Sequence, residues 1–190
     1  QGEMINVVRS SNQSLEGLDE LCQQYPIKKG IWASVISIPE EIQRQLQQLP
    51  FPMTEFTYQT PIPIRNLYKT PQTLGVDRLA AVIAAYTLKP HHPALVIDAG
   101  TCITYDFIDE FGQYQGGNIS PGMEMRFKAL HEFTSKLPKI QASGETPHYG
   151  NTTETAIRSG DIRGIAHEFI GYIQQLKFNP QSHMVVLTGG

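Results

Sequence analysis

The spacing of hydrophobic and polar residues is most regular in the second half of the chain. A continuous, alanine-rich apolar run over residues 78–88 predicts a buried helix. Residues 95–97 form a short apolar run and residues 103–107 alternate, which predicts two strands. A turn at residues 111–113 then leads into a third strand over residues 114–119. We therefore expect a three-stranded meander after the helix.

Longer periodic segments follow this meander. They predict a helix over residues 123–133, one or two helices over residues 155–176, and a strand over residues 184–187 that runs into Thr188-Gly189-Gly190. The second half thus reads strand, strand, strand, helix, helix, strand.

The first half alternates strands and helices. We predict strands over residues 4–8, 30–38 and 56–59. We also predict a helix from a cap at residues 14–17 to residue 22, a helix from Pro39 to residue 49, and an extended proline-rich loop over residues 61–73. With two more strands in front, this half would repeat the plan of the second. The pattern therefore suggests an α/β fold of two related lobes, with a first lobe in residues 1–66 and a second in residues 67–190.

Composition and charge exclude several classes of protein. The net charge of −3 leaves no polybasic surface, so nucleic acid is not expected as the primary partner. No apolar run is long enough to cross a membrane, and no signal peptide is visible. Cys22 and Cys102 have no metal-ligand spacing, which favours a reducing cytoplasm over a disulfide framework. Because Gln1 is not an initiator methionine, we expect residues upstream of it.

The segment D-A-G-T-C-I-T-Y-D, which begins at Asp98, is the strongest chemical signal. Gly100 allows a tight turn, and its free backbone N–H groups together with the Thr101 hydroxyl can hold phosphate oxygens. Asp98 can bind a cation beside them. The alternative is a β-hairpin in which Asp98 only caps its own turn.

Three shorter motifs accompany this segment. In G-V-D-R, Asp77 and Arg78 open a helix, either as a cap with a salt bridge or as a general base with an anion-binding arginine. The segment G-G-N-I-S-P-G, beginning at Gly116, allows close approach of a ligand or is simply a loop. The terminal T-G-G is common at nucleotide edges but is weak evidence by itself.

In this order the four motifs resemble those of type III pantothenate kinases, from Tyr68 to the end of the chain. The resemblance implies the actin/sugar-kinase/Hsp70 superfamily, whose fold is a pair of duplicated ribonuclease-H-like lobes. It implies ATP-dependent phosphorylation of pantothenate to 4′-phosphopantothenate, the first step of coenzyme A synthesis. It also implies ATP, Mg²⁺ and a monovalent cation (K⁺ or NH₄⁺) as cofactors, and a homodimer.

Roles follow from the resemblance by position. Asp77 corresponds to the proton acceptor, and Asp98 to the ligand of the monovalent cation. Thr101, with Gly100, corresponds to the ATP-contacting turn. The expected pantothenate-binding residues are Tyr68, Gly75, Val76, Asp77, Arg78 and Thr153. Thr153 would act across the dimer interface, and its neighbour Thr152 is the alternative.

The sequence departs from the family at both ends. It lacks the first phosphate loop, D-x-G-N-[TS], and the helices that follow T-G-G, so we expect an incomplete copy. Cys102 replaces a commoner alanine, which is a small change. These departures keep open a catalytically silent regulator or accessory factor on the same fold. A phosphatase resembling exopolyphosphatase is a third option, which the G-V-D-R segment with Tyr68 argues against.

Overall fold

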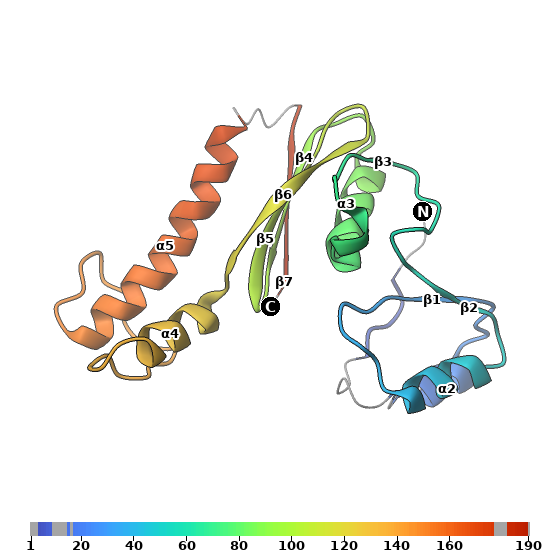
Figure 1. Cartoon of the computed structure of the whole chain (residues 1–190), viewed down its shortest axis with the longest axis horizontal. Coiled ribbons are helices and arrows are strands. Elements are labelled where there is room, and N and C mark those ends of the chain that lie inside the picture. Colours follow the sequence, from blue (N-terminus) through green and yellow to red (C-terminus); the bar gives the residue numbers. More distant parts are fainter. Residues whose placement is uncertain (1–3, 9–14, 16, 177–181, 190) are drawn as a thin grey trace. The chain divides into compact units, whose positions relative to one another are not determined.

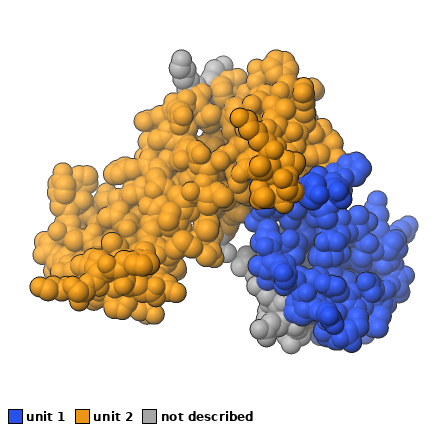
Figure 2. All heavy atoms as spheres, viewed as in Figure 1, with its two compact units in different colours: residues 1–61, 74–77 blue, residues 62–73, 78–190 orange. Residues whose placement is uncertain are grey.

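The computed structural model describes residues 4–8, 15, 17–176 and 182–189. The chain divides into two compact units, a smaller one of residues 1–61 and 74–77 and a larger one of residues 62–73 and 78–190 (Figure 2). The predicted division at residue 66 falls inside the short 62–73 segment of the larger unit. Each unit is mixed α/β, as the sequence pattern predicts.

A five-stranded sheet forms the centre of the larger unit (Figure 1). Its order is β3-β6-β5-β4-β7, where the strands are β3 (Arg65–Asn66), β4 (Ala94–Ala99), β5 (Cys102–Ile108), β6 (Gln113–Pro121) and β7 (Met184–Gly189). Strands β4, β5 and β6 run antiparallel, which confirms the predicted meander. Strand β3 is parallel to β6, and β7 is parallel to β4.

The β5–β6 hairpin turns where the sequence predicts it. Gly112 has a φ of 73°, a left-handed conformation that glycine adopts without strain. Its N–H donates to the Asp109 carbonyl at 3.1 Å, which closes the turn. The Asp109 carboxylate also accepts the N–H groups of Phe111 and Gln113. These local bonds fix the register of the two strands.

Helix α5 (Thr153–Gln175) packs against one face of this sheet. Its apolar side covers a buried cluster of strand residues, namely Leu95, Ile97, Ile103 and Tyr105. The Tyr105 ring stacks on Tyr172 at 3.9 Å and meets Phe169 edge-on at 6.0 Å. The predicted "one or two helices" are thus a single helix. Helix α4 (Met123–Glu132) packs against it through a second cluster, Phe127, Ile140 and Ile157.

Helix α3 (Val76–Leu88) begins two residues before the predicted start. It buries Leu79, Val82 and Ala85 on one side, while Leu88 is exposed. The helix is therefore amphipathic in its burial, although its sequence is apolar nearly all round. Just before it, Pro71–Thr73 form the short 3₁₀ helix η1 inside the predicted loop.

The smaller unit contains α1 (Leu18–Gln24), β1 (Gly30–Trp32), α2 (Glu40–Gln48) and β2 (Met53–Glu55). The two strands pair in parallel, with Gly30 opposite Met53. Pro39 caps α2 and two acids occupy its first turn, as predicted. The cap of α1 is Gly17, with a φ of 85°, which lies within the predicted cap at residues 14–17. Residues 14 and 16 lie outside the described residues.

Three strand predictions in this unit are wrong or displaced. Residues 4–8 form no regular structure. The predicted strand 30–38 ends at Trp32, because the Ser34 hydroxyl bonds both the carbonyl and the N–H of Ile36 and turns the chain. The predicted strand 56–59 lies instead at β2, since the Thr60 N–H donates to the Thr57 carbonyl in a turn.

Two findings concern the classes excluded by composition. Within the described ranges, no helix is both long and apolar enough to cross a bilayer. Cys22 is half-buried and Cys102 is exposed, and both are free thiols.

Candidate active site

Arg78, in the first turn of α3, points into the larger unit rather than into solvent. Its side chain is 6% exposed and forms an ion pair with Asp106 of β5, which is 1% exposed. The Arg78 Nη2 donates to Asp106 Oδ1 at 2.6 Å, and Nε donates to both carboxylate oxygens at 3.1 Å. Ion pairs joined by several hydrogen bonds are stronger than neutral hydrogen bonds. The Arg78–Asp106 pair therefore fixes the start of α3 on the sheet.

Two tyrosines complete this buried cluster. The Tyr114 hydroxyl donates to Asp106 Oδ1 at 2.6 Å. The Tyr68 ring stacks on Tyr114 with centroids 6.2 Å apart, and the Arg78 guanidinium lies 5.8 Å from the centroid of Tyr68. Arg78 and Tyr114 thus bond the Asp106 carboxylate directly, and Tyr68 packs against both of these side chains.

The titration of the cluster follows from its burial and charge. Burial alone would lower the pKa of Arg78, but its hydrogen bonds and charge pairing with Asp106 outweigh burial and raise that pKa. Burial raises the pKa of the Tyr114 hydroxyl, and its bond to Asp106 raises it further. Arg78 therefore stays a cation and Tyr114 a neutral donor.

Asp77 lies beside Arg78 but in a different environment. It is exposed and stands in the first turn of α3, where an acid favours the helix N-terminus. Gly75 and Val76, just before it, are half-buried. The structure thus turns the arginine of G-V-D-R inward and leaves the aspartate outward.

Asp98 is half-buried near the end of β4. Its register partners are Thr104 on β5 and Thr188 on β7. Residues paired directly across a sheet point to the same face, so two threonine hydroxyls flank the carboxylate. All of these donors are oxygens, which suits a hard cation.

The turn after β4 differs from prediction in one respect. The Gly100 N–H donates to the Cys102 carbonyl at 3.0 Å, so the expectation that this group is free is wrong. Gly100 and Thr101 are nevertheless exposed and line a pocket of about 570 Å³. The pocket is walled mainly by apolar residues of α4 and α5, including Met123, Ile162 and Phe169. A pocket of this size can hold a small ligand.

Thr152 and Thr153 open helix α5. Thr152 is its N-cap: the Thr152 hydroxyl accepts the Thr155 N–H at 3.2 Å, and the Thr155 hydroxyl accepts the Thr152 N–H at 3.0 Å. Thr153 is the first helical residue and is exposed. Thr152 is therefore used as the N-cap of α5, and the Thr153 side chain is exposed to solvent.

Sequence reasoning missed the residues that hold these segments in place. The sequence pattern identified Asp106 only as the last residue of the segment that begins at Asp98, and Tyr114 only as the first residue of a predicted strand. A signal was available, because an aspartate in mid-strand is disfavoured and implies a buried partner. The partner itself could not be found, since Arg78 is distant in the sequence.

The part of the chain that the structure describes has no group of three or more His, Cys, Asp or Glu side chains that could hold a metal ion. Asp98 with its flanking threonines suits a cation that also binds phosphate oxygens and water, as Mg²⁺ and K⁺ commonly do.

A strand-ending acid that leads into a glycine–threonine turn beside a pocket is typical of proteins that transfer phosphoryl groups. Comparisons with known proteins identify the group to which the chain is similar. The family model for type III pantothenate kinase matches residues 5–175. A relative from Phocaeicola vulgatus named type III pantothenate kinase is 60% identical over 190 residues, which are 100% of this chain and 78% of the relative. Another of that name, from Porphyromonas gingivalis, is 43% identical over 92% of this chain and 72% of its own length.

Among solved structures, a protein from Campylobacter jejuni described as a Baf family transcriptional activator matches with a TM-score of 0.51 and 19% identity. The match covers 88% of this chain and 80% of that one, and it shows the shared fold alone. On the family model and the close relatives, the chain belongs to the type III pantothenate kinase family, a family of ATP-dependent kinases. This membership favours the enzyme over the regulator and the phosphatase that the sequence left open.

Proposed function

We propose that this protein transfers the γ-phosphoryl group of ATP to the primary hydroxyl of pantothenate. The products are ADP and 4′-phosphopantothenate, and the reaction is the first step of coenzyme A synthesis. The observation that carries the proposal is the 60% identity to a type III pantothenate kinase along the whole chain. The roles of individual residues come from the family resemblance, and the site geometry supports them.

Asp77 accepts the proton of the attacking hydroxyl, or orients that hydroxyl. Its exposure and its place in the first turn of α3 support this role, because a substrate can reach its carboxylate. The neighbouring Arg78–Asp106 pair holds the helix start, so the base is carried on a rigid element. Phosphoryl transfer depends mainly on such positioning and on charge stabilisation.

Pantothenate lies against the segment that the same buried cluster holds. Tyr68, Gly75, Val76 and Arg78 are the proposed contacts on this chain. Since Nε and Nη2 of Arg78 already bond Asp106, the proposed contribution of Arg78 is chiefly to orient Tyr68 and the helix start. Thr153 of the partner subunit closes the pocket in a homodimer, which its exposure at the start of α5 allows.

ATP lies with its phosphates at the Gly100–Thr101 turn. The exposed Thr101 hydroxyl and the adjoining pocket support this placement. Asp98, Thr104 and Thr188 would hold the monovalent cation, and Mg²⁺ bound with ATP would supply further positive charge beside them. When bound, these cations offset the negative charge of the triphosphate.

The finer fold assignment belongs to the same proposal. The antiparallel meander β4-β5-β6 followed by α5 and the parallel strand β7 supports a ribonuclease-H-like second lobe. The parallel pair β1–β2 with α1 and α2 supports a related first lobe in residues 1–66. A cytoplasmic location is the natural setting for a coenzyme A precursor kinase with two free thiols.

Substitution of the proposed base tests the function. Asp77→Asn should keep the fold, since asparagine is also favoured at helix starts. It should lower kcat with ATP and pantothenate by about 10²–10⁴-fold. The readout is pantothenate-dependent ADP release by the purified protein.

Glu40→Gln is the matched control, because Glu40 is an exposed first-turn acid on another helix, α2. It should retain wild-type turnover. Near wild-type turnover in Asp77→Asn would remove Asp77 from the mechanism. A full-length wild-type protein that releases no ADP in the presence of ATP and pantothenate would overturn the proposed function itself.

A further inference from the structure

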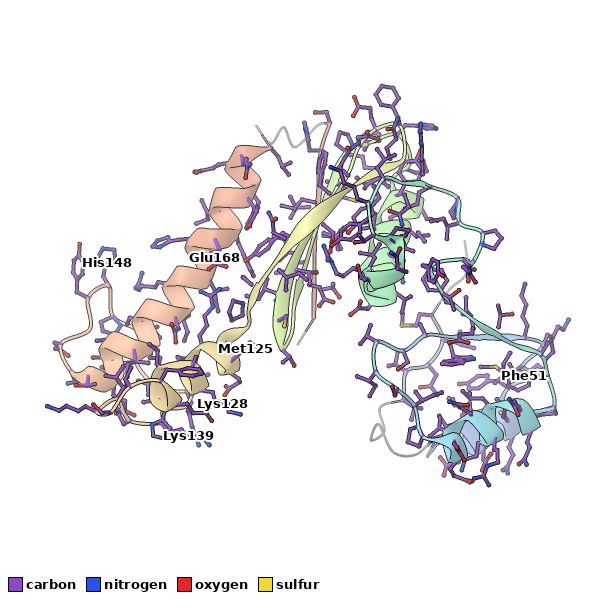
Figure 3. The ribbon with its side chains drawn as sticks, viewed as in Figure 1. Phe51, Met125, Lys128, Lys139, His148 and Glu168 are labelled. Atoms are coloured by element: carbon purple, nitrogen blue, oxygen red, sulfur yellow. The ribbon has the colours of Figure 1, made fainter. Side chains whose placement is uncertain are left out.

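Glu168 of α5 joins three elements outside the residues assigned above (Figure 3). Its Oε2 accepts the Tyr105 hydroxyl of β5 at 2.9 Å and the Ser120 hydroxyl of β6 at 3.0 Å. Its Oε1 accepts Nη2 of Arg126, on α4, at 2.7 Å. One carboxylate therefore connects both helices to the sheet.

Arg126 holds the end of β6 from the other side. Its Nε donates to the Pro121 carbonyl at 2.8 Å, and its Nη2 also approaches the Ser120 hydroxyl at 3.3 Å. Ser120 and Pro121 belong to the G-G-N-I-S-P-G motif, to which the proposed function gives no task. Arg126 and Glu168 together fix the last two residues of this strand.

The fixed segment lies directly on the Gly100–Thr101 turn. The Gly122 N–H donates to the Thr101 carbonyl at 3.0 Å. A Cβ at Gly122 would overlap the Gly100 carbonyl oxygen and would lie 2.9 Å from the Thr101 carbonyl carbon. Only glycine therefore allows the two backbones to approach this closely. Any movement of Ser120 and Pro121 is passed to the turn through this contact.

The ion pair also joins the two helices that line the pocket, in addition to their apolar cluster of Phe127, Ile140 and Ile157. Met123 and Glu124 of α4 line the pocket on one side, and Ile165 and Phe169 of α5 line it on the other. Arg126 and Glu168 lie on the same two helices, within one turn of these residues. The Arg126–Glu168 ion pair therefore connects the helix on one side of the pocket, α4, to the helix on the other side, α5.

The environment of the pair is suited to a fixed geometry. The Arg126 side chain is 17% exposed and that of Glu168 is 33% exposed, unlike the exposed Lys128–Glu132 pair on α4. Burial would raise the pKa of Glu168, but bonds from Arg126, Tyr105 and Ser120 outweigh it and lower that pKa. The carboxylate is thus charged at neutral pH and has its acceptors filled.

We propose that Arg126 and Glu168 are positioning residues for the nucleotide: they set the distance between α4 and α5 and hold the Gly100–Thr101 turn through Ser120, Pro121 and Gly122. This rests on the proposed function, in which ATP occupies that turn. Weakening the pair should therefore impair ATP binding selectively. Pantothenate, on the Tyr68 and Asp77 segment, should be affected little.

The test compares Glu168→Gln, Arg126→Lys and the double variant with Glu132→Gln. The last is the matched control, because it breaks an exposed ion pair on the same helix as Arg126. For each protein, kcat, the two KM values, Tm and ATP affinity by calorimetry are measured. Each single variant should raise KM and Kd for ATP about tenfold, which is the loss of one charge-assisted hydrogen bond. The KM for pantothenate should stay within about twofold of the wild type, and Glu132→Gln should behave as wild type.

A double variant no worse than the single variants would show that the two residues act as one unit, as proposed. A purely structural role would lower Tm and the amount of active protein while leaving KM and Kd for ATP unchanged, and that result would overturn the proposal. If Glu168→Gln does not fold, the KM and Kd for ATP of the milder variant Arg126→Lys test the proposal instead. A wild type that binds ATP but does not phosphorylate pantothenate would refute only the proposed function, since calorimetry still tests the pair.

Discussion

Three aspartates of the larger unit show how environment assigns different tasks to one residue type. Asp106 is fully buried and bonded to Arg78 and Tyr114, so it acts as an anchor. Asp98 is half-buried between two threonines at the end of β4, where a cation can reach it. Asp161 of α5 has a buried Oδ2 atom without a hydrogen-bond partner, so its charge is poorly compensated. The difference lies in the partners, not in the sequence neighbours.

Replacement of Asp98 by asparagine should reduce the dependence of activity on potassium. A neutral amide cannot offset the charge of a cation, so the cation and the nucleotide should bind more weakly together. The measurement is a titration of activity with potassium at fixed ionic strength, with choline as the replacement cation. An unchanged potassium dependence would mean that Asp98 serves only the turn.

Asp161 gives a prediction about pH and stability. Burial raises its pKa, and the charge of Arg126 only partly opposes this. A carboxyl with a raised folded-state pKa favours folding when protonated, so its contribution is present below the unfolded pKa and is lost as pH rises through the folded pKa. Asp161→Asn should therefore raise Tm by about 2–4 °C at pH 8, corresponding to roughly 1 kcal/mol.

The same variant should have a smaller effect at pH 4, because a larger fraction of the wild-type carboxyl is protonated there than at pH 8. Thermal unfolding of both proteins at the two pH values gives the comparison. A lower Tm in Asp161→Asn at pH 8 would show that the charge is compensated by a group that the aspartate binds in solution.

At the scale of elements, strand β6 links the two functional segments. Its middle passes over the Arg78–Asp106 pair, and its end lies on the Gly100–Thr101 turn. Gly117 is the point of closest approach, because a Cβ there would overlap the Tyr105 carbonyl oxygen and the Asp106 carboxylate. Gly117 thus reflects tight packing more than flexibility.

Gly117→Ala should destabilise the protein and weaken pantothenate binding. The added methyl would push apart the ion pair and the backbone of β5, at a cost of about 1–3 kcal/mol. Gly171→Ala on α5 is the control, because nothing lies within 4 Å of its Cβ position. The control should be as stable as the wild type or slightly more stable. Equal Tm values for Gly117→Ala and the wild type would show that β6 can shift without loss.

At the scale of the whole molecule, the proposed dimer predicts that the residues of one active site come from two subunits. If Thr153 acts across a two-fold interface, Asp77→Asn removes a group that a subunit supplies to its own site, whereas Thr153→Val removes a group that it supplies to its partner's site. A heterodimer of the two variants then has one intact site and one site with both defects. Co-expression should restore activity that neither homodimer has.

If Thr153 serves its own subunit, every site of that heterodimer carries a defect and no activity returns. Light scattering at micromolar concentration should first show a dimer for the wild type and for both variants. A monomeric wild type would refute the interface, and so would a failure to restore activity in a confirmed heterodimer.

Much of the second half of the chain was accessible from sequence because its signals are local. The meander, the hairpin at Gly112 and helices α3, α4 and α5 follow from alternation, turn residues and helical periodicity over a few neighbouring residues. The first half was predicted less well. Side-chain turns at Ser34 and Thr60 compete with the strand pattern there, and hydrophobicity does not report them.

The sequence by itself determined the family and the order of the elements in the second half of the chain, and it supplied the motifs proposed to bind phosphate and substrate, since each of these signals is a short run of neighbouring positions. Only the tertiary structure decided what those residues contact. It turned Arg78 inward to Asp106, occupied the Gly100 N–H, used Thr152 as a cap, and joined Arg126 to Glu168. The Arg78–Asp106 and Arg126–Glu168 pairs join residues far apart in the chain, so they form only when packing brings their elements together and excludes water from the buried charges.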